Sequence, residues 1–472
     1  MSFPSKNFVI LSGAKDLLFL ANKRLPAFSR LASSILLIFA FSSVSAAQKR
    51  STTAAKSAPA DPDRLIALKC TGTTRYTDQE ILAASGLQLG RPATDADFKE
   101  AVQSLGNSGL FKAVSYTYSS SDKGVKLELQ IADADKTKLV PAHFENFVWF
   151  TDDELLAALR PRVPLFKQLL PLTGNLSDRV TEALQALLTE KHLPGRVSFL
   201  REGDLGGGAL HGINYQVEEV DIRIHDLAFP GASPEQTALL ASAAHHLIGA
   251  VYARTSLTAT ASFDLLPVYL QRGFLKASFA MPDARVLART ASSADQDSTD
   301  LQVDAILPVT PGKVYAISRV DWKGNSALPI AELASQVHLP PGQPADAVRL
   351  AGDIETLRKL YRSRGYMTVT ISSNAVLNDE KNTVHYDLNI AEGDLYKMGG
   401  LEILGLDTQT TARMRAAWTL REGQPYNAEY PKKYLRDTGP LLPRGLDWAV
   451  TTHETPDAKD KTVDVEIRFK QR

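Results

Sequence analysis

The sequence predicts an α+β protein made of a row of small units, each with the element order β-α-α-β-β. The first observation is a glycine that ends a helical stretch and recurs roughly every 80 residues. The second is a strand of alternating apolar and polar residues that closes each unit. A repeat of this length suits small domains, each with two helices on one face of a three-stranded mixed sheet. The recurring glycines are Gly109, Gly195, Gly273, Gly365 and Gly445.

We expect a signal peptide at residues 1–46 and a flexible leader at 47–63. The apolar run 35–41 lies behind basic residues and ahead of small ones, which is typical of a cleaved secretory signal; an uncleaved signal anchor is the alternative. The leader is rich in Ala, Ser, Thr, Pro and Lys, so it cannot bury enough apolar surface to fold. Five units are predicted to follow, at 64–135, 136–219, 220–311, 312–393 and 394–472.

Unit one illustrates the element order. Its first helix is expected to begin with a capping box formed by Thr77 and Glu80. Its second helix follows Thr94 as the cap, with Phe98 and Leu105 on one face. The predicted elements are a strand from Leu65, helices over 77–85 and 94–108, and strands over 111–118 and 125–131.

Unit four has the clearest pattern. Leu350, Ile354 and Leu357 recur at helical spacing, and Gly365 follows where a left-handed residue would stop the helix. Gly324 and Asn325 indicate a turn after the first strand. The predicted elements are strands over 315–322, 366–371 and 384–390 and helices over 331–337 and 347–364.

Units two, three and five depart from this pattern locally. Unit two contains an insertion-like stretch at 161–174 with three prolines, and unit three has a polar loop at 291–300. In unit five Pro431, Pro440 and Pro443 lie where the long helix should be, so we expect that helix to be short or broken. Each unit still closes with an alternating strand, at 213–217, 301–307 and 463–469.

Composition argues against several functions. The chain has 53 basic and 53 acidic residues, so no basic excess predicts a nucleic-acid partner. The single cysteine, Cys70, can form no internal disulfide and is expected to be a small buried residue on a strand. No phosphate-binding loop, nucleophile elbow, zinc-protease motif or paired C-x-x-C is present. We therefore expect no enzyme, no cofactor and no small-molecule substrate.

Three local clusters of residues are explained by local structure and not by a binding site. Residues 206–208 are a glycine cluster without a following Lys-Ser/Thr, which favours a loop over a phosphate site. His245 and His246 are adjacent on a helix and so do not share a face, and we expect no metal there. The acidic run 152–154 suits the positive end of a helix.

Unit four also resembles POTRA domains, the periplasmic units that precede the barrel in outer-membrane protein assembly factors of the BamA type. The resemblance spans roughly 64–472, with specific motifs in unit four and less clearly in units one and three. In the family a barrel follows the last unit, and here the sequence ends at Arg472, so the chain is expected to be the arm without the barrel. The motifs are Leu357, Leu360 and Tyr361 followed by 362–366, the Gly324-Asn325 turn, and Glu392-Gly393.

The resemblance implies a binding mode. In the family the strand after the glycine lies at a sheet edge, where an extended client segment can add by β-augmentation. The alternative for any single edge is that it is covered or only solvated. The candidate edges are 111–116, 274–279 and 366–371, with Phe111, Val114, Tyr116, Phe274, Ala277, Phe279, Tyr366, Val369 and Ile371 as the tentative binding residues.

These observations favour a non-catalytic periplasmic scaffold that acts in outer-membrane protein assembly or transport. Its expected partner is an outer-membrane barrel protein or an unfolded outer-membrane client, through which it would associate with the outer membrane. The alternative is an inner-membrane, signal-anchored assembly or division factor with a periplasmic POTRA-like arm. A hydrolase is disfavoured because no residue pattern identifies a nucleophile with its base.

Overall fold

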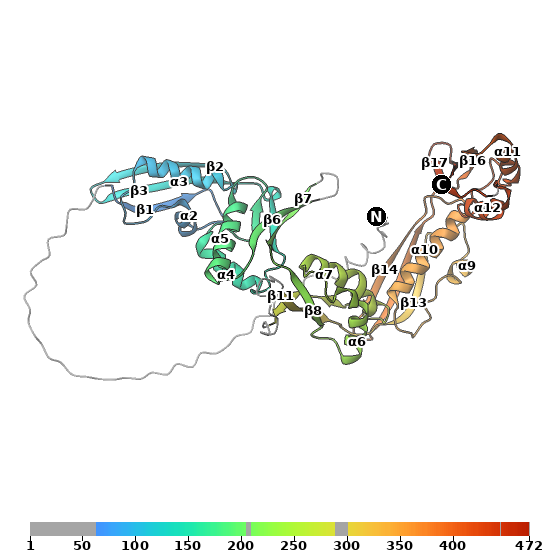
Figure 1. The fold of residues 1–472 in the computed structure, drawn as a ribbon, viewed down its shortest axis with the longest axis horizontal. Helices are drawn as coiled ribbons and strands as arrows, with labels where there is room; N and C mark the ends of the chain where they lie inside the picture. The colour runs from blue at the N-terminus through green and yellow to red at the C-terminus, as the bar shows by residue number, and fades with distance from the viewer. Residues whose placement is uncertain (1–62, 204–208, 288–300, 444, 472) are drawn as a thin grey trace, which may run out of the picture.

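The computed structural model describes residues 63–203, 209–287, 301–443 and 445–471. The predicted signal peptide, nearly all of the leader, the 206–208 glycine cluster and the 291–300 loop lie outside the described residues. Small sheets with their helices follow one another in chain order along the molecule (Figure 1). The predicted α+β class with small mixed sheets is confirmed. We keep the five unit names for these groups of elements.

Unit one has a three-stranded sheet in the order β1-β3-β2, with β1 parallel and β2 antiparallel to the central strand. Thr77 forms the predicted capping box, because its amide donates to Glu80 Oε2 at 2.8 Å and the Glu80 amide donates back to Thr77 Oγ1 at 3.2 Å. The elements are β1 (Leu65–Thr71), α2 (Asp78–Ser85), α3 (Asp95–Asn107), β2 (Phe111–Ser121) and β3 (Gly124–Asp133).

Unit two has a four-stranded sheet, β5-β4-β7-β6, where three strands were predicted. The insertion-like stretch 161–174 supplies the extra strand, β5, which pairs antiparallel with β4. A short 3-10 turn, η1 (Lys136–Lys138), precedes the unit. Its elements are β4 (Leu139–Phe144), α4 (Asp152–Arg162), β5 (Leu169–Pro171), α5 (Leu176–Glu190), β6 (Arg196–Gly203) and β7 (Leu210–Glu218).

Unit three is the most divergent. Its main sheet has the order β10-β11-β8, and a separate two-stranded ladder joins β12 to β9. One helical run is interrupted by a π-helical turn, η3 (Ala261–Leu265). The other elements are β8 (Ile222–Ala228), α6 (Pro234–Ala243), η2 (His245–Leu247), α7 (Arg254–Thr260), α8 (Leu266–Leu270), β9 (Ser278–Phe279), β10 (Asp283–Val286), β11 (Leu301–Ile306) and β12 (Val309–Thr310).

Units four and five repeat the topology of unit one, with sheet orders β13-β15-β14 and β16-β18-β17. The long helix of unit five is short, as predicted from its prolines, and ends in a 3-10 turn, η4 (Gly439–Leu441). The elements are β13 (Ala316–Lys323), α9 (Ile330–Ala334), α10 (Ala347–Ser363), β14 (Thr370–Asn378), β15 (Thr383–Ala391), β16 (Lys397–Leu404), α11 (Thr408–Ala417), α12 (Tyr430–Thr438), β17 (Trp448–Asp457) and β18 (Thr462–Gln471).

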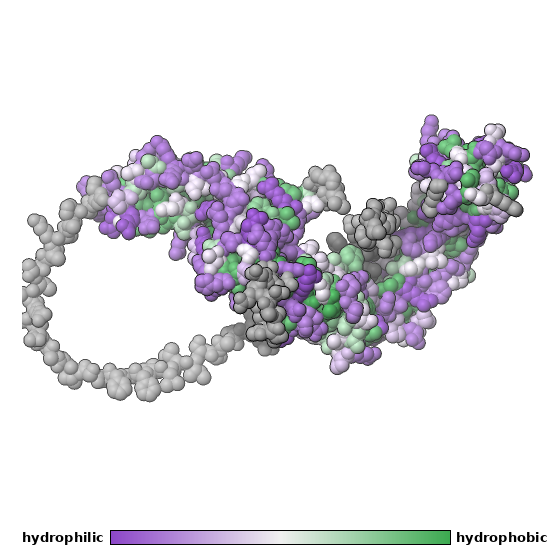
Figure 2. Space-filling model, viewed as in Figure 1, coloured by the Kyte–Doolittle hydropathy of each residue, from purple (hydrophilic) through white to green (hydrophobic). Residues whose placement is uncertain are grey.

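The alternating closing strands put their apolar side chains into the cores. Leu127, Leu129 and Ile131 are buried in unit one, and the corresponding residues of β15 and β18 are buried in units four and five. Units three, four and five each have their own apolar cluster, whereas a single continuous cluster extends through units one and two. The described surface visible in Figure 2 is mainly hydrophilic, with hydrophobic residues scattered among the polar ones.

All five recurring glycines have left-handed backbone conformations, with φ between 78° and 103°. Glycine adopts this conformation without the Cβ penalty that other residues suffer, which explains its recurrence after the helices. Among the described residues, no helix combines the length and apolarity that a membrane crossing requires.

Candidate functional site: the edge strands and the joints between units

The outer edge of the unit-one sheet is β2, which pairs with β3 on one side only. The predicted residues Phe111, Val114 and Tyr116 all lie in this strand. With 11 residues, β2 is the longest strand in the described part of the chain. Because the N–H and C=O groups of a strand residue point to the same side, every second residue of β2 presents both groups to the outside of the sheet.

Polar side chains of α3 lie beside β2. Tyr116 Oη donates to Asp95 Oδ1 at 2.6 Å, and Lys99 Nζ lies 2.7 Å from Asp95 Oδ2. Lys99, followed by the Tyr116 hydroxyl, holds the pKa of Asp95 below its usual range, and the hydrogen bond to Asp95 raises the pKa of Tyr116. These contacts join side chains only, so they do not occupy the backbone edge of β2.

In unit four the edge strand β14 begins at Thr370, later than predicted. Of the three predicted residues only Ile371 lies in the strand; Tyr366 and Val369 precede it. The Tyr366 amide donates to the Tyr361 carbonyl at 3.1 Å and the Val369 amide donates to the Tyr366 carbonyl at 3.3 Å, so the backbone completes a helix-ending turn before it extends.

The predicted edge 274–279 of unit three is wrong for the same reason. The Phe274 amide donates to the Tyr269 carbonyl at 3.2 Å and the Ala277 amide donates to the Phe274 carbonyl at 3.1 Å, which makes this segment a turn. Of the three predicted binding residues only Phe279 lies in a strand, β9 (Ser278–Phe279), and that strand pairs with β12. The edge of the main sheet is instead β10, which has four residues.

Two further edge strands that follow a recurring glycine were not predicted as binding edges. They are β6 of unit two and β17 of unit five, each at the outside of its sheet. Both follow a recurring glycine, Gly195 or Gly445, and this is the signal that could have found them. The edge of β6 is contacted by Gln185 of α5, and the edge of β14 by Arg358 of α10, which donates to the Ile371 carbonyl at 2.7 Å.

The same backbone contact joins units three to four and four to five. The Tyr315 amide donates to the Gly273 carbonyl at 2.8 Å, and the Tyr396 amide donates to the Gly365 carbonyl at 2.8 Å. Both tyrosines are buried at the start of the next unit. We call this contact the glycine–tyrosine latch.

Close approach at the latch requires glycine as well as a left-handed φ. A Cβ atom on Gly273 would lie 2.8 Å from the Tyr315 carbonyl oxygen, and one on Gly365 would lie 2.8 Å from the Tyr396 carbonyl oxygen. The recurring glycine therefore ends a helix and also seats the next unit.

Units two and three are joined by Arg254, a buried side chain at the start of α7. It donates to the Phe144 carbonyl at 3.2 Å, pairs with Asp152, and lies 3.8 Å from Asp283 of β10. Burial disfavours the charge of Arg254, but the Asp152 carboxylate outweighs it and raises the Arg254 pKa. Asp152 thus begins α4, as predicted, and also binds across the joint.

Units one and two are joined by the segment that contains β5. Lys167 Nζ donates to the Arg75 carbonyl at 2.8 Å and to Glu80 Oε2 at 3.0 Å. The approach at Gly109 is so close that a Cβ there would lie 1.9 Å from the carbonyl oxygen of Thr173. The insertion-like stretch therefore forms the joint to unit one.

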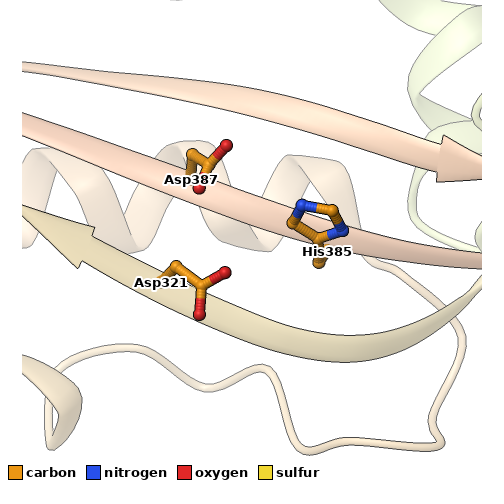
Figure 3. A group of neighbouring side chains, drawn as sticks. All are labelled: Asp321, His385 and Asp387. Carbon is orange, nitrogen blue, oxygen red and sulfur yellow. The ribbon is translucent and has the colours of Figure 1, made fainter.

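One group of side chains on the unit-four sheet could hold a metal ion by type and spacing. Asp321, His385 and Asp387 place one ligand atom each within 4.8 Å of one another (Figure 3). Asp321 and Asp387 are direct partners in the β13–β15 ladder. Each carboxylate already has a basic neighbour, because Arg319 Nε lies 2.8 Å from Asp321 and Lys323 Nζ lies 3.2 Å from Asp387. A cation would have to displace both partners.

His245, His246 and Cys70, which were also considered from the sequence, form no binding site among the residues that the structure describes. His245 and His246 are exposed in the short turn η2. Cys70 lies half-buried in β1, and burial followed by the nearby Asp78 raises its pKa to about 12. Its thiol therefore stays protonated at neutral pH, which agrees with a packing role.

Comparison with known families identifies one of these units directly. Residues 315–393 match the family model POTRA, described as the surface antigen variable number repeat. This segment is similar to a POTRA domain. The match covers β13 to β15 with the intervening helices, so the resemblance inferred from the unit-four motifs is confirmed.

Solved structures with POTRA domains are similar to parts of the chain. The POTRA3-5 segment of BamA from Haemophilus influenzae is 17% identical and covers 53% of this chain and 96% of its own, with a TM-score of 0.38. POTRA1-3 of the periplasmic domain of Omp85 from Anabaena is 17% identical and covers 53% and 95%, with a TM-score of 0.24.

Proposed function

We propose that this chain is a non-catalytic periplasmic scaffold that binds extended segments of outer-membrane proteins by strand addition. The observation that carries the proposal is the long outer edge of β2 in a chain that also contains a segment similar to a POTRA domain. The physical basis is that the edge offers a row of backbone N–H and C=O groups, which an extended segment can pair with in any sequence.

The length of β2 supports this kind of client. A strand that crosses an outer membrane has about 9–11 residues, and β2 has 11. Each backbone hydrogen bond contributes about 0.5–1.5 kcal/mol net, so a paired segment gains affinity along its length with little dependence on side chains. An unfolded barrel protein, whose strands are not yet paired, has this chemistry.

A photocrosslinking amino acid at Thr117 tests the proposal. Thr117 is exposed on β2, and its register partner Glu128 is exposed on the central strand β3, which has no outer edge. We expect crosslinking in the periplasm from Thr117, mapped by mass spectrometry to barrel strands of outer-membrane proteins, and much less from Glu128. Equal capture from both positions, or capture outside barrel strands, would contradict strand addition at β2.

Hydrogen exchange gives a second measurement. The side chains of Val114, Tyr116 and Tyr118 lie on the core-facing side of β2. Val197 has the corresponding position on β6, and its amide donates to Gln185, away from the sheet. In both units the strand after the glycine is the outermost one: β2 lies outside β3, and β6 lies outside β7. We therefore infer that Val114, Tyr116 and Tyr118 point their amides away from the sheet. A bound strand should slow the exchange of these three amides and leave the intervening residues unchanged.

The proposed location depends on cleavage of the predicted signal. We propose that the mature protein begins near Ala47 and reaches the outer membrane through its partner. Sequencing the N-terminus of the protein isolated from cells tests this. A retained residue 1 would instead support the inner-membrane anchor.

A further inference from the structure

A side chain occupies the outer edge of β6 where an added strand would pair. The Val197 amide donates to Gln185 Oε1 at 2.8 Å, and Gln185 Nε2 donates to the Gly195 carbonyl at 3.3 Å. A carboxamide has one acceptor and a donor group, as a peptide bond does. Gln185 therefore offers β6 the same two groups that a neighbouring strand would offer.

The position of this contact matters because β6 is short. The strand has eight residues, and alternation from Val197 gives Val197, Phe199 and Arg201 as the residues whose backbone groups point outward. Gln185 binds the amide of the first of these residues, Val197. An incoming segment would have to displace the side chain or begin its pairing later on a strand with little length left.

We propose that Gln185 is a guard that closes the β6 edge to client strands. The inference rests on the proposed function and adds a specificity-determining residue to it. Removing the guard should make the β6 edge available for strand addition.

Unit one lacks this arrangement. Lys99 precedes Gly109 by as many residues as Gln185 precedes Gly195, but an ammonium group has no acceptor for a strand amide. Lys99 pairs with Asp95 instead, and its side chain is 69% exposed. The difference between the two helices accounts for an open β2 and a guarded β6.

Unit four shows a partial version of the guard. Arg358 donates to the carbonyl of Ile371, near the start of β14, and pairs with Glu355 on its own helix. A guanidinium has donors only, so it can occupy a carbonyl and no amide. Strand addition further along β14 stays compatible with this contact.

The test uses the full-length protein with a synthetic ten-residue peptide of alternating apolar and polar residues as the probe. A photocrosslinking amino acid is placed at Thr117 on β2 or at Arg201 on β6. Each is combined with the natural sequence, with Gln185→Ala, or with Glu182→Ala, which removes an exposed side chain from the same helix. Crosslinking yield to the peptide is measured, together with hydrogen exchange of the Val197 amide.

We expect Thr117 to capture the peptide in all three proteins. Arg201 should capture it only with Gln185→Ala, with a yield about tenfold above the natural sequence because two competing hydrogen bonds are gone. Without peptide, Gln185→Ala should speed exchange at Val197, and Glu182→Ala should not.

Two outcomes overturn the guard alone, and a third overturns both the guard and the proposed function. Equal capture at Arg201 with and without Gln185, or unchanged exchange at Val197 in Gln185→Ala, shows that Gln185 does not close the edge. Capture at neither position in any protein overturns strand addition itself and the guard role with it. The Thr117 yield distinguishes failure of the guard from failure of the proposed function.

Discussion

The joint between units one and two differs in kind from the joints on either side of unit four. The first is an apolar contact: one cluster of buried residues extends through both units, and β5 is part of the connection. The joints at Tyr315 and Tyr396 each contain the glycine–tyrosine latch, and the units on either side keep separate cores, with one side chain of the preceding unit, Leu275 or Met367, packed against the next core. Burial of apolar area couples the stability of neighbours, whereas a latch of one hydrogen bond fixes their geometry and couples them less.

The largest expected effect comes from Leu170→Ala in β5. Leu170 is fully buried in the shared cluster, so its truncation should cost about 2–5 kcal/mol. Hydrogen exchange should rise in both unit one and unit two and stay unchanged in unit five. Leu169→Ala is the control, because Leu169 is 45% exposed. Faster exchange confined to unit two would mean that the two units are not coupled.

The latch is tested by Gly365→Ala. The left-handed φ of 97° alone should lower the free energy of unfolding by about 1–3 kcal/mol. The new Cβ would also lie too close to the Tyr396 carbonyl oxygen. Gly445→Ala separates these causes, since Gly445 has a φ of 80° but no atom within 4 Å of the point where a Cβ would lie. We expect faster exchange of the Tyr396 amide in Gly365→Ala only, and equal destabilisation of the two variants would argue against the latch.

Glu392 gives a pH-dependent measure of unit four alone. Burial raises the pKa of Glu392, but hydrogen bonds from Ser326 and the Ala327 amide outweigh it and hold the pKa below its ordinary 4.5. Its stabilisation is therefore present above pH 4.5 and is lost as the pH falls through the lowered folded-state value. Glu392→Gln should be less stable at neutral pH and should flatten the acid side of the unit-four unfolding profile. An unchanged profile would contradict this.

The smallest effect is expected for Lys167→Ala at the first joint. The pair with Glu80 is partly exposed, so its loss should cost about 0.2–1 kcal/mol, including the contact of Lys167 with the Tyr76 ring at 5.0 Å. Urea unfolding monitored in unit one is the measurement. A loss as large as that of Leu170→Ala would show that polar contacts, and not the shared core, hold this joint.

Much of the fold could be predicted because its signals are local. Alternation in 384–390 and the capping box at Thr77 are set by neighbours in sequence. The turn after Gly273 and the extra strand β5 were missed, since apolar residues such as Phe274 can satisfy either an edge strand or a core-facing turn. The role of Gln185 could not be predicted, because the sequence around this glutamine gives no sign of the backbone groups that the fold brings to it.

The glycine–tyrosine latch also bears on how such a chain can grow. Its bond runs between two main-chain atoms, and the close approach requires a residue without a Cβ in the preceding unit. A duplicated segment bounded by these two positions would carry its own connector at both ends. Copying such a segment would therefore lengthen the architecture and repeat the same main-chain connection.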